Sequence, residues 1–172
     1  MIEVRIDDLA FFRGAALVRP ANADLGATTP LLRRLEAAAG PALLGQLRLQ
    51  EPLPVGAAVV TAAGDLAVDL IVHAVVSSET EPVTPASVRR ALTNALQRTI
   101  DWQLDSIGIA PFGLGAGNLD IEESAEIMAE VITTHMERRG GAAGGFPRSV
   151  CVVAESSREE EVLAGAFARA TR

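Results

Sequence analysis

The chain contains no lysine and no tyrosine, a single cysteine, and few aromatic residues, which occupy 3% of its 172 positions. No mechanism can therefore use a lysine as nucleophile, base or Schiff-base partner. A lone Cys151 excludes a disulfide framework and a multi-cysteine zinc site. No apolar run approaches the roughly 20 residues of a membrane span, and the first residues lack the pattern of a signal peptide. We therefore expect a soluble, cytoplasmic protein that does not engage membranes.

The chain is rich in apolar and acidic residues. Hydrophobic residues make up 49% of it, and the formal net charge is −7. This acidic balance argues against nucleic acid as a partner, because such binding draws on a general positive field. The length is that of one typical domain, which can bury about 70% of the surface of its unfolded chain. We expect one domain over residues 1–172.

Short apolar runs of strand length alternate with longer helical patterns along the chain. Residues 2–6 alternate apolar and charged residues, as a half-buried strand does. Uninterrupted apolar runs, typical of strands covered on both faces, follow at 15–18, 59–60, 70–76, 106–110 and 150–153. This alternation predicts a three-layer α/β/α sandwich around a mixed, mostly parallel sheet.

Capping residues mark where the helices begin. Thr29 and Thr84 each place a hydroxyl before a proline at the first helical position, and the two helices are expected to end at Gly40 and near Trp102. Capping-box spacings occur at Asp120 with Glu123 and at Ser157 with Glu160. The Gly/Ala-rich stretch between residues 139 and 147 is predicted to be a mobile loop.

The clearest chemical signal is residues 110–118, Ala-Pro-Phe-Gly-Leu-Gly-Ala-Gly-Asn, between a predicted strand and a predicted helix. Alternating glycines allow close approach of a ligand, and the N–H groups of such a loop can bind an anion. The stretch is neither a Walker loop nor a dinucleotide fingerprint. A tight strand-to-helix connection would need the same glycines, so both interpretations stay open.

Asn22 and Asp24 follow a predicted strand, where open α/β sheets bind ligands. The simpler interpretation, which the spacing favours, is a side chain folded onto its own turn. His73 lies inside an apolar strand and is expected to be a satisfied core residue, whereas His135 is expected to be solvated near a helix end. Cys151 is expected to be a small buried hydrophobe. No triad or metal cluster can be drawn, so we assign no catalytic residue, metal or cofactor.

Several short motifs of the chain follow one another in the order and spacing of a known protein family. Asp7-Asp8-Leu9 is followed, eleven residues after Asp8, by Arg19-Pro20-Ala21-Asn22 and then by Ala37-Ala38-Ala39-Gly40. Further on come Ile71-Val72-His73 and Ile107-Gly108-Ile109-Ala110-Pro111-Phe112-Gly113-Leu114-Gly115. In this order and spacing the pieces resemble the macro domain family, which is known for binding ADP-ribose and related nucleotides. The resemblance covers nearly the whole chain and implies the same three-layer fold.

The resemblance also implies roles for individual residues. Asp8, in one turn with Leu9, would accept the adenine amino group, and Asn22 would lie near the distal ribose. The second diphosphate loop would consist of Gly113, Leu114, Gly115 and Ala116, followed by Gly117 where the family has an aromatic residue.

The first diphosphate loop departs from the family pattern, because Ala27-Thr28-Thr29-Pro30 stand where it is rich in glycine. Side chains replace hydrogens there, and Pro30 has no N–H to offer. Thr28 or Thr29 could supply a hydroxyl instead, beside a helix N-terminus that favours anions. Arg19, which replaces the family's first Asn, is expected at the mouth of the cleft, where its fork could pair with a phosphate.

Catalysis by the family's usual routes is not supported by the residues present. Leu32 stands where the hydrolytic branch has an Asp, and the lysine of another branch is absent. We therefore expect a non-catalytic binding module for ADP-ribose or a related nucleotide diphosphate. One alternative is a structural or oligomerisation module without nucleotide binding, and a second is an ADP-ribosyl hydrolase using Asn22 and a water. Assembly into a homo-oligomer is left open.

Overall fold

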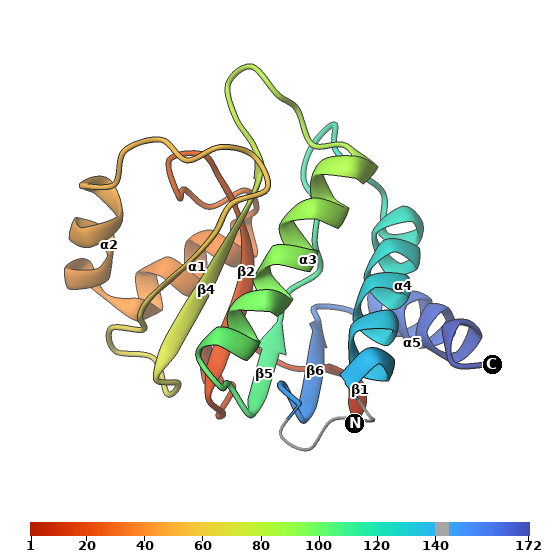
Figure 1. The fold of residues 1–172 in the computed structure, drawn as a ribbon. Helices are drawn as coiled ribbons and strands as arrows, with labels where there is room; N and C mark the ends of the chain where they lie inside the picture. Colours follow the sequence, from red (N-terminus) through yellow and green to blue (C-terminus); the bar gives the residue numbers. More distant parts are fainter. Residues whose placement is uncertain (140–144) are drawn as a thin grey trace.

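The computed structural model describes residues 1–139 and 145–172. A six-stranded sheet with strand order β1-β6-β5-β2-β4-β3 forms its middle layer (Figure 1). Every strand pair is parallel except β3 with β4 at one edge, which confirms the mixed, mostly parallel sheet. The strands are β1 (Ile2–Ile6), β2 (Ala16–Asn22), β3 (Ala58–Ala62), β4 (Leu70–Ser77), β5 (Ser106–Ile109) and β6 (Ser149–Ala154).

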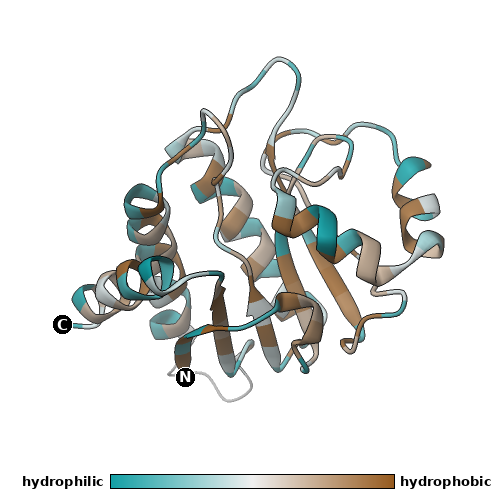
Figure 2. Ribbon diagram, turned by 180° about the vertical axis from the view of Figure 1, so that it is seen from behind, coloured by the Kyte–Doolittle hydropathy of each residue, from teal (hydrophilic) through white to brown (hydrophobic). Residues whose placement is uncertain are grey.

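Helices cover both faces of the sheet. On one face α3 (Pro85–Asp101), α4 (Ile121–Arg139) and α5 (Ser157–Ala170) pack against the strands through one apolar cluster. On the other face a second cluster joins the sheet to α1 (Pro30–Ala39), α2 (Pro41–Arg48) and the short 3-10 helix η1 (Leu9–Phe11). The central strands are hydrophobic along most of their length (Figure 2). The predicted three-layer sandwich is therefore confirmed.

Most of the predicted helix caps are confirmed. Thr29 accepts a hydrogen bond from the N–H of Leu32, and Gly40 ends α1 with a φ of 93° that favours glycine. Thr84 and Ser87 form a reciprocal capping box at the start of α3. Asp120 likewise accepts from the N–H of Glu123.

Four details differ from the prediction or lie beyond it. The N-cap of α5 is Ser156, which accepts from the N–H of Glu159, so the predicted cap at Ser157 is wrong by one residue. The helix α2 was not predicted, because Gly40 both ends α1 and precedes the proline that opens α2. His135 is not simply solvated, since its Nε2 lies 3.0 Å from the Phe146 carbonyl oxygen. Residues 140–144 of the predicted mobile loop lie outside the described residues.

The alternation of side chains along the strands places two polar residues together. Leu17 and Ala21 of β2 face the α1/α2 side, and Arg19 between them faces the same way. His73 of β4 likewise shares a face with Ile71. Because β2 and β4 pair with Arg19 opposite His73, the two side chains meet beneath α1.

No helix within the described ranges is long and apolar enough to span a membrane. Cys151 is buried, as predicted, and burial raises the pKa of its thiol.

Candidate functional site

The sheet has a topological switch point between its neighbouring strands β2 and β5. After β2 the chain enters α1 on one face, whereas after β5 it enters α4 on the other. Where connections leave in opposite directions, the loops separate and leave a crevice at the carboxyl ends of the strands. Two loops flank this position: residues 23–29, here called the first loop, and residues 110–119, the glycine loop.

The glycine loop has the backbone shape that its composition predicts. Gly113, Gly115 and Gly117 have φ values of 82°, 137° and 76°, which L side chains rarely adopt. The loop closes on itself through the N–H of Leu119, which donates to the Gly113 carbonyl. Within the described part of the chain, the backbone N–H groups of residues 113–117 have no hydrogen-bond acceptor. Gly113 is buried, whereas residues 114–117 are at least partly exposed, so their N–H groups are available to an anion.

The first loop lies against the glycine loop. A Cβ built on Gly115 would lie 3.2 Å from the Thr28 carbonyl oxygen, so only glycine fits comfortably there. Thr29 caps α1, with its oxygen accepting from the Leu32 N–H while its own hydroxyl hydrogen stays available. Both threonines thus stand between the glycine loop and the N-terminus of α1.

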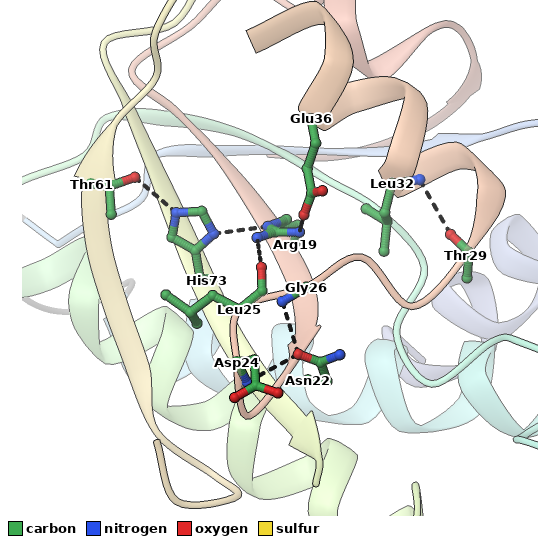
Figure 3. Close-up of polar contacts among 10 residues, drawn as sticks. All are labelled: Arg19, Asn22, Asp24, Leu25, Gly26, Thr29, Leu32, Glu36, Thr61 and His73. Atoms are coloured by element: carbon green, nitrogen blue, oxygen red, sulfur yellow. Dashed lines mark hydrogen bonds and ion pairs between the residues drawn. The ribbon is translucent and has the colours of Figure 1, made fainter. Parts of the chain in front are cut away.

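Asn22 organises the turn that opens the first loop (Figure 3). Its Oδ1 accepts from the N–H of Asp24 at 3.0 Å and from that of Gly26 at 2.8 Å. This is the turn-forming role that the spacing favoured, and it leaves the amide N–H₂ group without an acceptor among the described residues. Asn22 and Asp24 also line a hollow of about 500 Å³ together with Pro52 and residues 77–80.

Arg19 is buried and fully engaged within the protein, so the expectation that it stands at the mouth of a cleft is wrong. Its side chain is 1% exposed. Nε donates to Nδ1 of His73 at 2.8 Å, Nη1 pairs with Glu36 at 2.7 Å, and Nη2 donates to the Leu25 carbonyl at 2.6 Å (Figure 3). The β-sheet register and the approach of α1 turn the side chain inward, away from any phosphate.

Electrostatics in this cluster follow from burial. Burial lowers the pKa of Arg19, and the charge and hydrogen bond of Glu36 counter that effect. Burial also lowers the pKa of His73 well below its usual range, and the Arg19 charge lowers it further. His73 is thus a neutral, satisfied core histidine, as predicted.

Asp8 and Leu9 follow β1 at the same edge of the sheet. Asp8 caps η1, its Oδ1 accepting from the N–H of Ala10 at 2.9 Å, and its other oxygen has no donor within the described ranges. Leu9 is entirely buried, backbone included. Three strand spacings of about 4.8 Å separate β1, which precedes Asp8, from β2, which precedes the first loop, a distance of about 14 Å between the two strands. The helix η1 itself contacts α1.

Residues 18–128, which include the first loop, the glycine loop and the strands that carry them, match the family model described as Macro domain. The chain belongs to the Macro domain family.

Relatives and solved structures agree with this membership. The O-acetyl-ADP-ribose deacetylase of Klebsiella pneumoniae is 30% identical over 142 residues, covering 79% of this chain and 81% of the relative. An uncharacterized protein of Aeropyrum pernix is 27% identical over 96% of this chain and 82% of its own length. One of Mycobacterium tuberculosis is 24% identical over 78% of this chain, which spans only 37% of that protein.

A variant of the Oceanobacillus iheyensis macrodomain, solved with ADPR, superimposes with a TM-score of 0.83 at 22% identity, covering 98% of this chain and 92% of that one. The Trypanosoma brucei macrodomain in complex with ADP gives a TM-score of 0.82 at 20% identity, covering 96% and 68%. These likenesses concern the fold.

In this macro domain, three apolar side chains could cover the glycine loop: those of Leu32, Phe12 and Phe11. Leu32 is buried in the α1/α2 cluster, Phe12 packs on Gly108, and Phe11 is 74% exposed. The atoms nearest a Cβ on Gly113 belong to Val88 and Leu119, and neither residue lies on the first loop.

Sequence reasoning missed two residues of the macro domain that hold the site together. Glu36 is the counter-ion of Arg19, and Leu25 has a φ of 59° and offers its carbonyl to the same guanidinium. The signal that could have found them was a pair of polar residues, Arg19 and His73, in otherwise apolar strands. A buried guanidinium requires a carboxylate nearby.

Proposed function

We propose that this macro domain binds ADP-ribose or a related nucleoside diphosphate along the carboxyl edge of its sheet, with the diphosphate between the glycine loop and the first loop. The observation that carries the proposal is the row of unpaired backbone N–H groups at residues 113–117, held by glycines and placed beside the N-terminus of α1. A doubly charged diphosphate suits both features.

The remaining candidate residues extend the site along the edge. Asp8 offers a carboxylate oxygen without a donor, which suits an adenine amino group, and Asn22 offers its amide N–H₂ to a ribose hydroxyl. The roughly 14 Å between their strands calls for an elongated ligand. The solved complexes of related macrodomains with ADPR and ADP support this choice of ligand class.

The hydroxyls of Thr28 and Thr29 take the place of lost glycine N–H contacts in this proposal. Thr29 can donate its hydrogen to a phosphate while it accepts from Leu32. Arg19 is not part of the proposed ligand contact, because its nitrogens are engaged inside the protein.

A second candidate function, hydrolysis of ADP-ribosyl derivatives, is favoured by the 30% identity to a deacetylase. The local chemistry opposes it. Leu32 is 1% exposed among apolar side chains, so no carboxylate stands at that position. We therefore propose binding without hydrolysis.

Calorimetric titration of two glycine variants with ADP-ribose tests the proposal. Gly115→Ala adds a methyl group between the two loops, 2.9 Å from the Asn118 amide and 3.2 Å from the Thr28 oxygen. Gly45→Ala, in the middle of α2 with open space around it, is the matched control. We expect the wild type and Gly45→Ala to bind alike and Gly115→Ala to lose at least tenfold in affinity. Equal affinity in all three chains would refute the proposed diphosphate site.

A further inference from the structure

The proposed ligand contacts make no use of the most unusual feature of the core, the buried pair of Arg19 and His73 with their partly buried partners Glu36 and Thr61. Arg19 and His73 are 1% and 0% exposed, on strands whose other inward side chains are apolar. Burying a guanidinium costs several kcal/mol unless it is paired and hydrogen-bonded. Each nitrogen of Arg19 is accordingly bonded, and each bond leads to a different element of the fold.

The hydrogen bonds of this group run in one direction only. Because Nε of Arg19 donates, Nδ1 of His73 must be unprotonated and its proton must sit on Nε2. Nε2 lies 2.8 Å from the hydroxyl of Thr61, and that hydroxyl donates to the Ala62 carbonyl at 2.9 Å. Only the neutral Nε2–H tautomer of His73 satisfies every partner.

The other two hydrogen bonds of the guanidinium hold one residue within the first loop and one residue in the helix that follows it. Nη2 holds the carbonyl of Leu25, and Nη1 holds Glu36, two turns into α1. The segment between these two contacts carries Thr28, whose carbonyl lies beside Gly115, and Thr29, which caps the helix. The φ of 59° at Leu25 is costly for a leucine and persists only where its surroundings hold it.

We propose that Arg19 is the positioning residue of the first loop, because it holds both ends of the segment from Leu25 to Glu36. Neutral His73 keeps the guanidinium in place, and acidification therefore releases the loop. The claim that the loop contacts a nucleotide rests on the proposed function, whereas the claim that acidification releases the loop does not.

The charges around His73 set the direction of this response. On β2 the group facing it is the Arg19 cation, on β3 the uncharged Thr61, and on α1 the Glu36 carboxylate, which binds Arg19 from the far side. The residues of α2 that line the same small space, Leu43 and Leu47, are apolar.

Protonation of His73 would set two N–H donors and two positive charges against each other across 2.8 Å. The contact must then open. A guanidinium that rotates away from His73 also loses its hydrogen bond to the Leu25 carbonyl.

Amide hydrogen exchange of the whole chain between pH 7.5 and pH 5, corrected for intrinsic rates, tests the proposal. The reporters are the N–H groups of Asp24 and Gly26, which bond to Asn22 inside the turn. We expect their protection in the wild type to fall at least tenfold more than that of amides in β5. Loop protection that stays level with β5 would overturn the proposal.

His73→Asn separates positioning from general stability. An Asn at this position keeps an oxygen where Nδ1 accepts from Arg19 but gains no proton, so loop protection should become independent of pH. Leu92→Val weakens the opposite core without touching the loop and should retain the response of the wild type. If His73→Asn keeps the full pH response, or fails to fold while the wild type shows no selective loss, the proposal is wrong.

Titration with ADP-ribose at the same two pH values links the loop to its ligand. Affinity in the wild type should fall as the pH is lowered from 7.5 to 5 and should stay constant in His73→Asn. A wild type that binds no ADP-ribose at pH 7.5 would refute the proposed function, and the exchange data would still decide the positioning role. Binding that is equally tight at pH 5, with the loop released, would refute the claim that positioning serves the ligand.

Discussion

The burial of neutral His73 predicts how the stability of the whole protein depends on pH. The pKa of His73 in the folded state lies well below 6.5, because burial and the Arg19 charge oppose protonation. In the unfolded chain the same histidine has an ordinary pKa of about 6.5. Below that pH the unfolded state binds one proton more than the folded state, so the free energy of unfolding falls as the pH falls.

The size of the effect follows from linkage. One extra proton on the unfolded state lowers the free energy of unfolding by about 1.4 kcal/mol for each pH unit. The loss begins near pH 6.5 and continues until the pH reaches the lowered pKa of the folded state. Above pH 6.5 the contribution is complete and constant. Between pH 6.5 and 5 the loss through His73 is therefore at most about 2 kcal/mol.

Urea unfolding of the wild type and of His73→Asn at several pH values between 5 and 8 measures this contribution. All other titratable groups are the same in both chains, so their contributions cancel in the difference between the two free energies. The difference should be flat above pH 7 and should change by about 1.4 kcal/mol per pH unit below 6.5, with the wild type losing stability faster. A difference that stays constant from pH 8 to pH 5 would refute the neutral, buried state of His73.

The structure supports three further predictions. Glu36→Leu should lower the free energy of unfolding by about 3–5 kcal/mol, because it leaves Arg19 buried without its counter-ion, and a double-mutant cycle with Arg19→Met should show the two costs to be far from additive. Thr29→Ala should cost about 1 kcal/mol through loss of the α1 cap, measured by urea unfolding, and a cost near zero would contradict the cap. Wild-type protein should leave O-acetyl-ADP-ribose intact in a product assay, with hydrolysis expected only in a folded Leu32→Asp variant; turnover by the wild type would contradict the non-catalytic account.

The sequence was sufficient to predict most of the fold, because its signals are local. A capping threonine, a following proline and a closing glycine define α1 within a few residues, and each uninterrupted apolar run became a strand. The run at 59–60 is the exception to full burial, because β3 lies at the edge of the sheet and is only partly buried. The helix α2 was not predicted because Gly40 both ends α1 and caps α2, and composition alone does not reveal such a double role.

The candidate site was harder to predict, because it depends on contacts between distant parts of the chain. Arg19 meets His73, 54 residues away, only through the register of β2 with β4, and it meets Glu36 only because α1 folds back over the sheet. Taken alone, an arginine near a ligand loop favours phosphate binding. Because Arg19 is buried, its charge pairs with Glu36 inside the protein and not with a ligand.

Calorimetric titration of the wild type with ADP-ribose, with AMP and ADP as controls, tests the central claim most directly. We expect a Kd of about 1–100 μM for ADP-ribose. Asp8→Ala should weaken this affinity at least tenfold, whereas Asp105→Ala, which removes an exposed carboxylate at the opposite edge of the sheet, should leave it unchanged. No heat of binding up to millimolar ADP-ribose would contradict the account and would favour a macro domain that serves as a structural module.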